Sequence, residues 1–359
     1  MNRVKTPYFQ LYRKKLNANL EKLTYIERKT GVKILHTLKS FNHSEVTPLI
    51  ASALSGMSVS SSLEIKMAQK AKSKSLHLYA PAFKASEFKE LAQEVNSISL
   101  NSISQWQQFG SGDFSPTPKS LGLRINPKLQ IEIPNYCNPN LAHSRLGVDY
   151  QEFQKAYISN PKQFHSLKGL HFHALFRSQI EALEILLDHI INNYQAIIPQ
   201  LEWINLGGGH NLTDDDYDIK RFFHIIYNFQ AKFPHVQLYL EPGEAVLKEC
   251  GEFVASILDI ITIEHKKIAI LDTSIETHLL DVAIVNQRLK IKGAKNHPTP
   301  YVYELTGNSC LQGDIIGQYA FSSPLKVGDE IIFEDMMSYT LVKMTQFNGI
   351  KPPNMITSL

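Results

Sequence analysis

The sequence lacks several features that would each place it in a particular class of protein. It has 3 cysteines in 359 residues, and Cys137, Cys250 and Cys310 are scattered, odd in number and without metal-ligand spacing. We therefore expect neither a disulfide framework nor a zinc site. No block of basic residues stands out, although 37 Lys+Arg against 34 Asp+Glu give a formal charge of +3. Nucleic acid is not an expected partner.

Long apolar runs are also missing. The most apolar stretch, Val254 to Ile263, is too short to span a bilayer and contains Asp259. Residues Met1 to Pro7 have no apolar core behind their positive charges, so we expect no signal peptide. These absences predict a cytoplasmic protein with no membrane partner. A chain of this length can bury large cores and is expected to hold two domains.

Short apolar runs and helical patterns alternate through the first two thirds of the chain. Eight β-like runs each end in a turn: Lys33 to Leu38, Gly56 to Val59, Ser75 to Tyr79, Ser97 to Leu100, Leu121 to Ile125, Leu167 to His173, Trp203 to Leu206 and Gln237 to Leu240. Helical patterns cover Arg13 to Lys29, Ser44 to Leu54, Ser62 to Lys72, Ala85 to Val95, Tyr150 to Tyr157, Ser178 to Ile198 and Asp215 to Phe233. Eight strand and helix units predict an α/β fold with a (β/α)8 barrel, and a doubly wound open sheet is the alternative.

From Gly251 onward the sequence favours strands with few helices. The predicted strands are Phe253 to Ile263, Lys267 to Leu271, Gln287 to Lys292, Tyr301 to Thr306, Glu330 to Phe333 and Tyr339 to Thr345. They predict an antiparallel β domain after the barrel. Pro7 to Tyr12 is a predicted edge strand and the candidate first strand of that domain. The expected domains are then a barrel over 14–244 and a β-rich domain made of 1–13 and 245–359.

Polar residues gather where the predicted barrel strands end, and barrels of this kind carry their chemistry at those carboxyl ends. Lys39 follows the first strand, where a partly desolvated ammonium group would have a lowered pKa and could serve as a Schiff-base lysine. Alternatively, it points into water. His173 ends the sixth strand and could instead be a core histidine. Glu241 ends the eighth strand, where the turn at Pro242 and Gly243 holds its carboxylate at the mouth, unless it belongs to an ion pair.

Gly207, Gly208 and Gly209 end the seventh strand. A glycine-rich turn is weak evidence alone, but three residues without Cβ directly after a strand let backbone N–H groups converge on a phosphate. The next helical pattern opens with Thr213 and three aspartates, which would already satisfy a helix N-terminus. We therefore expect a phosphate on the glycine amides rather than on that helix.

Together these residues resemble the fold-type III pyridoxal-phosphate (PLP) decarboxylases, a group with ornithine, arginine and diaminopimelate decarboxylases. The shared motifs follow one order over almost the whole chain: Lys39, Phe172-His173, Gly207-Gly208-Gly209, Glu241-Pro242-Gly243, Gly307-Asn308-Ser309-Cys310, Tyr339-Thr340 and Phe347-Asn348-Gly349. The chain is most similar to the polyamine branch of the group, which decarboxylates carboxynorspermidine or carboxyspermidine. Its short length, the residues around Lys39, and Glu244 in place of an arginine point to that branch.

The resemblance implies a role for each barrel residue. Lys39 would bind the aldehyde of pyridoxal 5'-phosphate, His173 would stack on the pyridine ring and Glu241 would hydrogen-bond the ring nitrogen. The three glycines, Gly243 and the Tyr339 hydroxyl would hold the phosphate. A carboxylate at the ring nitrogen favours decarboxylation, because it keeps the ring protonated, whereas racemases of this fold place an arginine there.

The resemblance also implies a homodimer with shared active sites and a small-molecule polyamine substrate. Cys310 and Asp314 match residues that reach into the neighbouring subunit's site in the family. Cys310 would reprotonate the α-carbon, and Asp314 would bind the far amine of the substrate, unless it is only a turn aspartate. Asp272 and Glu244 are further candidates for substrate binding, because a polyamine needs several carboxylates.

Departures from the larger relatives bear on the substrate. Ser58 stands near the position of an aspartate, Phe176 near that of a serine, and Leu311 replaces the acidic residue that follows the cysteine. Diaminopimelate or another basic amino acid is the alternative substrate. Two other interpretations are an amino-acid racemase, which Glu241 argues against, and a non-catalytic PLP carrier, which the second domain and Cys310 disfavour.

Overall fold

The computed structural model describes residues 4–110 and 120–358. The chain divides into two compact units. Asn19–Val246 forms one unit, called the barrel unit below. Met1–Ala18 and Leu247–Leu359 form the other, called the β-rich unit. Within the described ranges, we find no helix with the length and apolar character of a membrane span.

Parallel strands close the barrel unit into the predicted (β/α)8 barrel. The strands are β2 (Lys33–Thr37), β3 (Gly56–Val59), β4 (Leu76–Tyr79), β5 (Ser97–Leu100), β6 (Leu121–Asn126), β8 (Gly169–His171), β9 (Trp203–Asn205) and β10 (Gln237–Leu240). They follow the order β5-β4-β3-β2-β10-β9-β8-β6, and the pairing of β5 with β6 closes the ring. This closure excludes the open sheet. All residues of β3 to β6 are buried, as expected for parallel strands covered on both faces.

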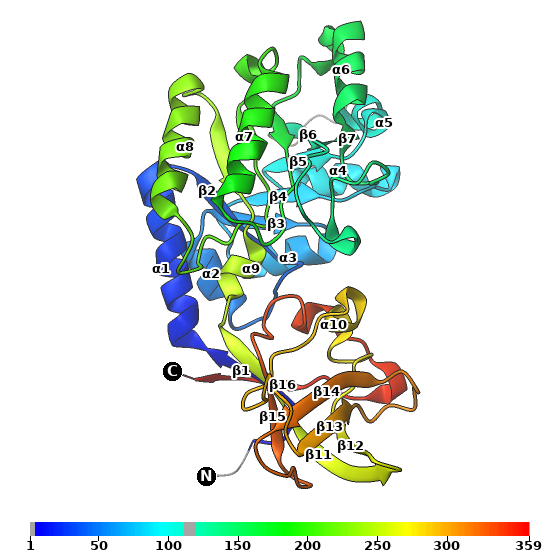
Figure 1. Cartoon of the computed structure of the whole chain (residues 1–359). Helices are drawn as coiled ribbons and strands as arrows, with labels where there is room; N and C mark the ends of the chain where they lie inside the picture. The colour runs from blue at the N-terminus through cyan, green and yellow to red at the C-terminus, as the bar shows by residue number, and fades with distance from the viewer. Residues whose placement is uncertain (1–3, 111–119, 359) are drawn as a thin grey trace. The chain divides into compact units, whose positions relative to one another are not determined.

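Helices lie outside the barrel strands (Figure 1). They are α1 (Arg13–Thr30), α2 (Thr47–Ala53), α3 (Ser62–Lys70), α4 (Ala85–Gln93), α5 (Ile103–Gln105), α6 (Tyr150–Ser159), α7 (Ile180–Tyr194), α8 (Ile219–Lys232) and α9 (Gly243–Leu247). A two-residue strand, β7 (Val148–Asp149), pairs with β6. Side-chain oxygens cap the start of several helices. At α6, for example, the Asp149 carboxylate accepts hydrogen bonds from the backbone N–H groups of the first turn.

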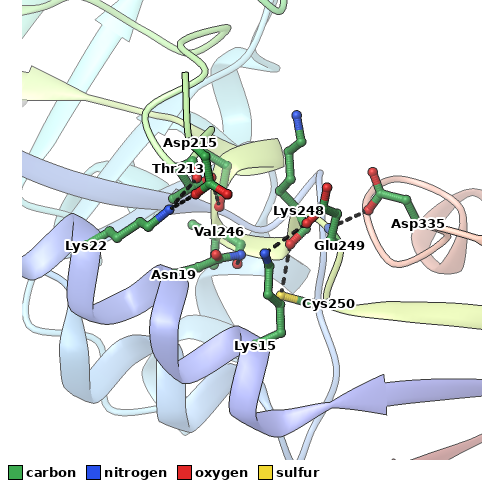
Figure 2. A network of polar contacts seen from close by, with 11 residues as sticks. Lys15, Asn19, Lys22, Thr213, Asp215, Val246, Lys248, Glu249, Cys250 and Asp335 are labelled. Atoms are coloured by element: carbon green, nitrogen blue, oxygen red, sulfur yellow. Dashed lines mark hydrogen bonds and ion pairs between the residues drawn. The ribbon is translucent and has the colours of Figure 1, made fainter. Parts of the chain in front are cut away.

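Polar contacts fasten α1 along its length (Figure 2). In the β-rich unit, Lys15 Nζ forms an ion pair with Glu249 at 2.8 Å. In the barrel unit, Lys22 Nζ donates to the Thr213 carbonyl at 2.9 Å and pairs with Asp215 at 2.7 Å. These contacts hold Thr213 and Asp215, which follow β9, against α1. The next helix does not start at these residues.

The β-rich unit contains a mixed seven-stranded sheet, which corrects the prediction of an antiparallel one. Its strands are β1 (Tyr8–Tyr12), β11 (Gly251–Ile263), β12 (Lys266–Leu271), β13 (Tyr301–Thr306), β14 (Ile315–Phe321), β15 (Glu330–Glu334) and β16 (Asn354–Ser358). Most pairs are antiparallel, but β1 with β16 and β12 with β13 are parallel. The prediction that β1 is an edge strand is wrong, because β1 lies between β11 and β16. In the sequence β1 precedes the barrel and β11 follows it, so this pairing joins the two segments of the β-rich unit.

Two other strand predictions in this unit are wrong. Residues 287–292 follow α10 (Leu280–Val285) and form only an isolated bridge, between Ile291 and Phe333. The predicted strand from Tyr339 is interrupted at once, because Tyr339 has a left-handed φ of 64° and Leu341–Lys343 form a 3-10 helix. Conversely, β14 and β16 were not predicted.

Candidate active site at the barrel mouth

Lys39 lies in the turn that follows β2 and is partly buried. Burial lowers the pKa of its ammonium group; the charge of Glu241 raises the pKa, that of Arg124 lowers it and that of Glu64 raises it, with a net lowering. A lowered pKa increases the fraction of neutral amine, which is the nucleophilic form. The structure therefore gives Lys39 the environment that the sequence analysis expected at this strand end.

The turn that carries Lys39 packs directly on Gly243. The Thr37 hydroxyl donates to Ser40 Oγ at 2.9 Å, and the Ser40 hydroxyl donates to the Thr37 carbonyl at 2.7 Å. A Cβ at position 243 would lie 2.2 Å from Thr37 Oγ1 and 2.5 Å from Ser40 Oγ. Glycine is thus required here by the close approach of the lysine turn.

His173 follows β8 and is uncharged near neutral pH. Its pKa lies well below the usual range because of burial, with further lowering by the charges of Lys39 and Arg124. The backbone N–H of Gly208 donates to His173 Nδ1 at 2.9 Å. Because Nδ1 accepts this bond, the single ring proton of the neutral imidazole resides on Nε2.

Glu241 follows β10 and is buried, with 4% of its surface exposed. Its Oε1 accepts a hydrogen bond from Asn205 Nδ2 at 2.8 Å. Its backbone N–H donates to the carbonyl of Gly207 at 2.7 Å. These contacts fix both the backbone and the carboxylate of Glu241 against the glycine turn after β9.

The glycine turn uses two of its three amides inside the protein. Gly207 N–H donates to Asn205 Oδ1 at 2.8 Å and Gly208 N–H donates to His173. In the described part of the chain, Gly209 N–H has no partner. Gly209 has a φ of 88°, and a Cβ there would lie 2.2 Å from the Leu175 carbonyl oxygen. Of the three backbone N–H groups that we expected to converge on a phosphate, only that of Gly209 is left for one within this turn.

The helix after this turn also differs from the expectation. α8 starts at Ile219 and its cap is Asp218, whose carboxylate accepts from Arg221 N–H. The Thr213 hydroxyl instead donates to the Ala245 carbonyl at 2.8 Å. The prediction that Thr213 caps this helix is wrong, because its hydroxyl bonds to α9 and its carbonyl accepts from Lys22 of α1.

Arg124 is a buried cation that the sequence analysis did not single out. It comes from β6, is 2% exposed and donates through Nη2 to the His173 carbonyl at 3.2 Å. Its guanidinium carbon lies 4.6 Å from the centre of the Tyr79 ring. The His171 ring makes a T-shaped contact with that same ring, with 5.5 Å between the two ring centres. Neither His171 nitrogen has a hydrogen-bond partner among the described residues. An arginine inside an apolar strand was the available signal.

Glu64 is a second residue near Lys39 that sequence reasoning missed. It lies in the first turn of α3, and its Oε2 accepts from the backbone N–H of Ser60 at 2.7 Å. Burial raises the pKa of its carboxyl group, while that hydrogen bond and the charge of Lys39 lower it. Glu64 thus places a carboxylate on the helix that follows β3. In the larger relatives, an aspartate stands near the position of Ser58 in β3.

Glu244 forms a two-point ion pair with Arg177. Arg177 Nε donates to Glu244 Oε2 at 2.9 Å and Arg177 Nη2 donates to Oε1 at 3.1 Å. Arg177 has a φ of 45° and lies 5.2 Å from the centre of the Phe176 ring. The acid that the sequence analysis expected to bind substrate is therefore neutralised by a neighbour on the loop after β8.

In the β-rich unit, Cys310 is exposed on a loop with a defined backbone. Its N–H donates to Asn348 Oδ1 at 2.9 Å. Asp314 is buried at 3% exposure, and its carboxylate accepts from Ile275 N–H at 2.7 Å and from Ser309 N–H at 3.0 Å. The Asp314 carboxylate thus joins the backbone at Ile275 to the backbone at Ser309, the residue before Cys310.

Asp272 and Tyr339 belong to the same unit. The Asp272 carboxylate accepts from the Thr6 hydroxyl at 2.5 Å and from Ser256 N–H at 2.8 Å. Tyr339 is partly exposed with Lys343 Nζ 5.2 Å from its ring centre. A tyrosine with a left-handed φ is an uncommon conformation that often marks a functional position.

The barrel mouth thus combines an amine of lowered pKa, an uncharged imidazole, a fixed buried carboxylate and an open backbone N–H. This set matches a cofactor with an aldehyde, an aromatic ring, a ring nitrogen and a phosphate. Within residues 4–110 and 120–358, no group of three or more His, Cys, Asp and Glu residues could hold a metal ion.

Comparison with known proteins agrees with this chemistry. Residues 32–337 match the family model described as pyridoxal-dependent decarboxylase, C-terminal sheet domain. A carboxynorspermidine/carboxyspermidine decarboxylase of Campylobacter jejuni is 38% identical, over 99% of this chain and 93% of the relative. A carboxyaminopropylagmatine decarboxylase of Synechocystis is 35% identical, over 97% of this chain and 88% of the relative.

A solved structure gives the same relationship in three dimensions. The crystal structure of Campylobacter jejuni carboxynorspermidine decarboxylase complexed with norspermidine aligns with a TM-score of 0.87 and 37% identity, covering 99% of this chain and 94% of that one. Sequence motifs, barrel and near full-length relatives all agree. The chain belongs to the pyridoxal-dependent decarboxylases, and its relatives there include carboxynorspermidine/carboxyspermidine decarboxylases.

Proposed function

We propose that this protein binds pyridoxal 5'-phosphate and decarboxylates carboxynorspermidine or carboxyspermidine to norspermidine or spermidine. The observation that carries the proposal is the buried carboxylate of Glu241, fixed by Asn205 at the end of β10 in the same barrel mouth as Lys39. A carboxylate that keeps the ring nitrogen protonated favours decarboxylation, whereas the racemases of this fold keep the ring neutral. The 38% identity with a carboxynorspermidine/carboxyspermidine decarboxylase supports the same reaction class.

The barrel residues divide the binding of the cofactor among them. Lys39 would hold the aldehyde covalently, His173 would lie against the ring, Glu241 would meet the ring nitrogen and Gly209 N–H would donate to the phosphate. Gly207 and Gly208 would act through their shape and their internal hydrogen bonds. Gly243 would admit the lysine turn, and Tyr339 remains the proposed phosphate contact from the β-rich unit.

When bound, pyridoxal phosphate supplies an electron sink for the pair left on the α-carbon as carbon dioxide departs. The protein's part is to keep that sink effective. Glu241 would hold a proton on the ring nitrogen, and His173, being uncharged, would add no repulsion against the cationic ring. Burial lowers the pKa of Lys39, which increases the fraction of neutral amine that could bind the aldehyde.

Cys310 is the proposed acid that returns a proton to the α-carbon. The thiol sits on an exposed loop of the β-rich unit, which suits a residue that acts in a partner's site. We therefore propose a homodimer in which each subunit completes the other's active site. Exchange of subunits between two inactive variants, one at Lys39 and one at Cys310, tests this arrangement.

Recognition of the polyamine remains the proposed task of Glu244, Asp272 and Asp314. Glu244 can take it only if a substrate ammonium group replaces the Arg177 guanidinium in the two-point ion pair. Asp272 and Asp314 already accept hydrogen bonds within the β-rich unit, so a substrate would have to compete with Thr6 in the first case and with backbone N–H groups in the second.

The test is carbon dioxide release from purified protein loaded with pyridoxal phosphate. Carboxynorspermidine, carboxyspermidine, carboxyaminopropylagmatine, diaminopimelate, ornithine and arginine would be offered at equal concentrations, and kcat/KM compared. We expect one of the first two to give the highest value. A preference for ornithine, arginine or diaminopimelate would overturn the substrate assignment, and loss of optical rotation without gas release would indicate a racemase.

Carboxyaminopropylagmatine is a specific second candidate, because the Synechocystis relative with that activity is 35% identical over 97% of this chain. Its guanidinium end presents a planar, forked donor, whereas the proposed polyamines end in an ammonium group. A kcat/KM that is highest for carboxyaminopropylagmatine would select this candidate.

A further inference from the structure

Asn205, the last residue of β9, lies at the centre of the site without being one of the expected cofactor contacts. It is 1% exposed. Its Nδ2 donates to Glu241 Oε1 at 2.8 Å and its Oδ1 accepts from Gly207 N–H at 2.8 Å. The backbone N–H of Glu241 donates in turn to the Gly207 carbonyl at 2.7 Å. Three hydrogen bonds therefore join these three residues in a closed ring.

The orientation of the Asn205 amide follows from this ring. A backbone N–H can only donate, so the atom that faces Gly207 must be the amide oxygen. The amide NH2 group then has to face Glu241, which must present an accepting oxygen. An aspartate at this position would keep the bond to Gly207 but would offer Glu241 a second carboxylate instead of a donor.

We propose that Asn205 is a positioning residue that holds Glu241 at the ring nitrogen of the cofactor. By engaging Oε1, the amide leaves Oε2 as the oxygen available to the ring nitrogen. It also ties the carboxylate to the turn whose Gly209 amide would bind the phosphate. This inference rests on the proposed function, since it concerns the interaction between Glu241 and pyridoxal phosphate.

The backbone geometry separates this role from folding. When the Asn205 side chain is replaced, the backbone bond between Glu241 and Gly207 and the pairing of β9 with its neighbours need not change. The carboxylate loses its fixed direction, and Gly207 N–H loses its side-chain acceptor. Asn140 offers a matched control, because it is also buried in the barrel unit and also bridges two groups, the Ala174 carbonyl and Leu129 N–H, away from Glu241.

The first experiment uses binding in the absence of substrate. Pyridoxal phosphate and its analogue with CH in place of the ring nitrogen would be titrated into cofactor-free protein and followed by absorbance. Wild type should prefer the cofactor with the ring nitrogen. We expect Asn205→Leu to lose most of that preference, roughly tenfold or more, and Asn140→Leu to retain it.

The second experiment uses kinetics, with Asn205→Asp included in case Asn205→Leu does not fold. For Asn205→Leu we expect kcat to fall roughly 10- to 100-fold with little change in KM, because a buried bond to the reacting group is lost rather than a substrate contact. The Asp variant should recover activity toward lower pH, where its protonated carboxyl can again donate to Glu241.

The outcomes separate the inference from the proposed function. If wild type binds neither compound, the proposed function fails and this inference with it. If wild type prefers the ring nitrogen and both Asn205 variants keep that preference and wild-type kcat, only the positioning role is overturned. Equal losses in Asn205→Leu and Asn140→Leu that follow their loss of thermal stability would also overturn it, because they would indicate a purely structural amide.

Discussion

Replacing Asp314 tests whether its carboxylate builds the Cys310 loop or binds the substrate. Its oxygens accept from Ile275 N–H at 2.7 Å and Ser309 N–H at 3.0 Å, and the residue is 3% exposed. Asp314→Ala leaves the buried N–H of Ile275 and the partly buried N–H of Ser309 without their acceptor, at about 1–3 kcal/mol each. We therefore expect a loss of about 3–5 kcal/mol in the free energy of unfolding of the β-rich unit, a large part of the usual 5–15 kcal/mol of a domain.

Two measurements check this value. The urea midpoint reports stability, and hydrogen exchange reports whether the amides of Ile275 and Ser309 lose protection. Asp314→Asn should lose about half as much, because its amide oxygen can still accept one of the two bonds. Asp259→Ala, at an exposed aspartate of the same unit, is the control and should change stability by less than about 0.5 kcal/mol.

The same variants distinguish the loop from the substrate role. If Asp314 shapes the loop, kcat falls together with the protection of the two amides, because the thiol of Cys310 is displaced. Unchanged exchange and an unchanged urea midpoint, with a KM for the polyamine raised tenfold or more, would refute this reasoning. That result would support the direct contact with the substrate amine expected from the sequence.

Three further predictions follow from the site. Lys39→Ala should abolish both activity and borohydride labelling by the cofactor; labelling of another lysine would contradict the assignment. Cys310→Ala should slow turnover severely while the cofactor stays bound, and mixing it with Lys39→Ala under subunit exchange should restore about a quarter of the activity, for random pairing with one competent site per mixed dimer; no recovery would rule out the shared site. Burial lowers the pKa of His36 and of His210 to about 4 from 6.5. As the pH falls, these two histidines are protonated in the unfolded chain before they are protonated in the folded one. The contribution of the two neutral histidines to stability is therefore complete above pH 6.5 and is lost as the pH falls toward 4. At pH 5 the loss is about 2 kcal/mol for each histidine, and urea midpoints unchanged between pH 7 and pH 5 would disprove it.

The barrel was predictable because its strands are short, mostly buried and separated by turns. Lys33–Thr37, Gly56–Val59 and their counterparts carry no competing pattern, so local sequence and fold agree. The sheet of the β-rich unit was harder. β14 contains Gly317 at a φ of 144° beside a register shift in β13, so its sequence is typical of a turn although the neighbouring strand holds it extended.

The candidate site shows the same division. Residues at strand ends, such as Lys39 and Glu241, could be identified because the topology places those ends together. The partners could not, because which side chain meets which depends on loop geometry. Asn205 was visible at a strand end, but its bond to Glu241 required the fold. The ion pair of Arg177 with Glu244 likewise joins the loop after β8 to α9, two segments that have no pattern in common.

The pairing of β1 with both β11 and β16 has a consequence for the order in which the protein assembles on the ribosome. β1 leaves the exit tunnel before the entire barrel, whereas both of its partners are synthesised after it. The barrel can therefore complete its ring while β1 still lacks neighbours, and the last five-residue strand must emerge before that sheet is finished. A stop codon just before β16 would leave one side of β1 open to another chain.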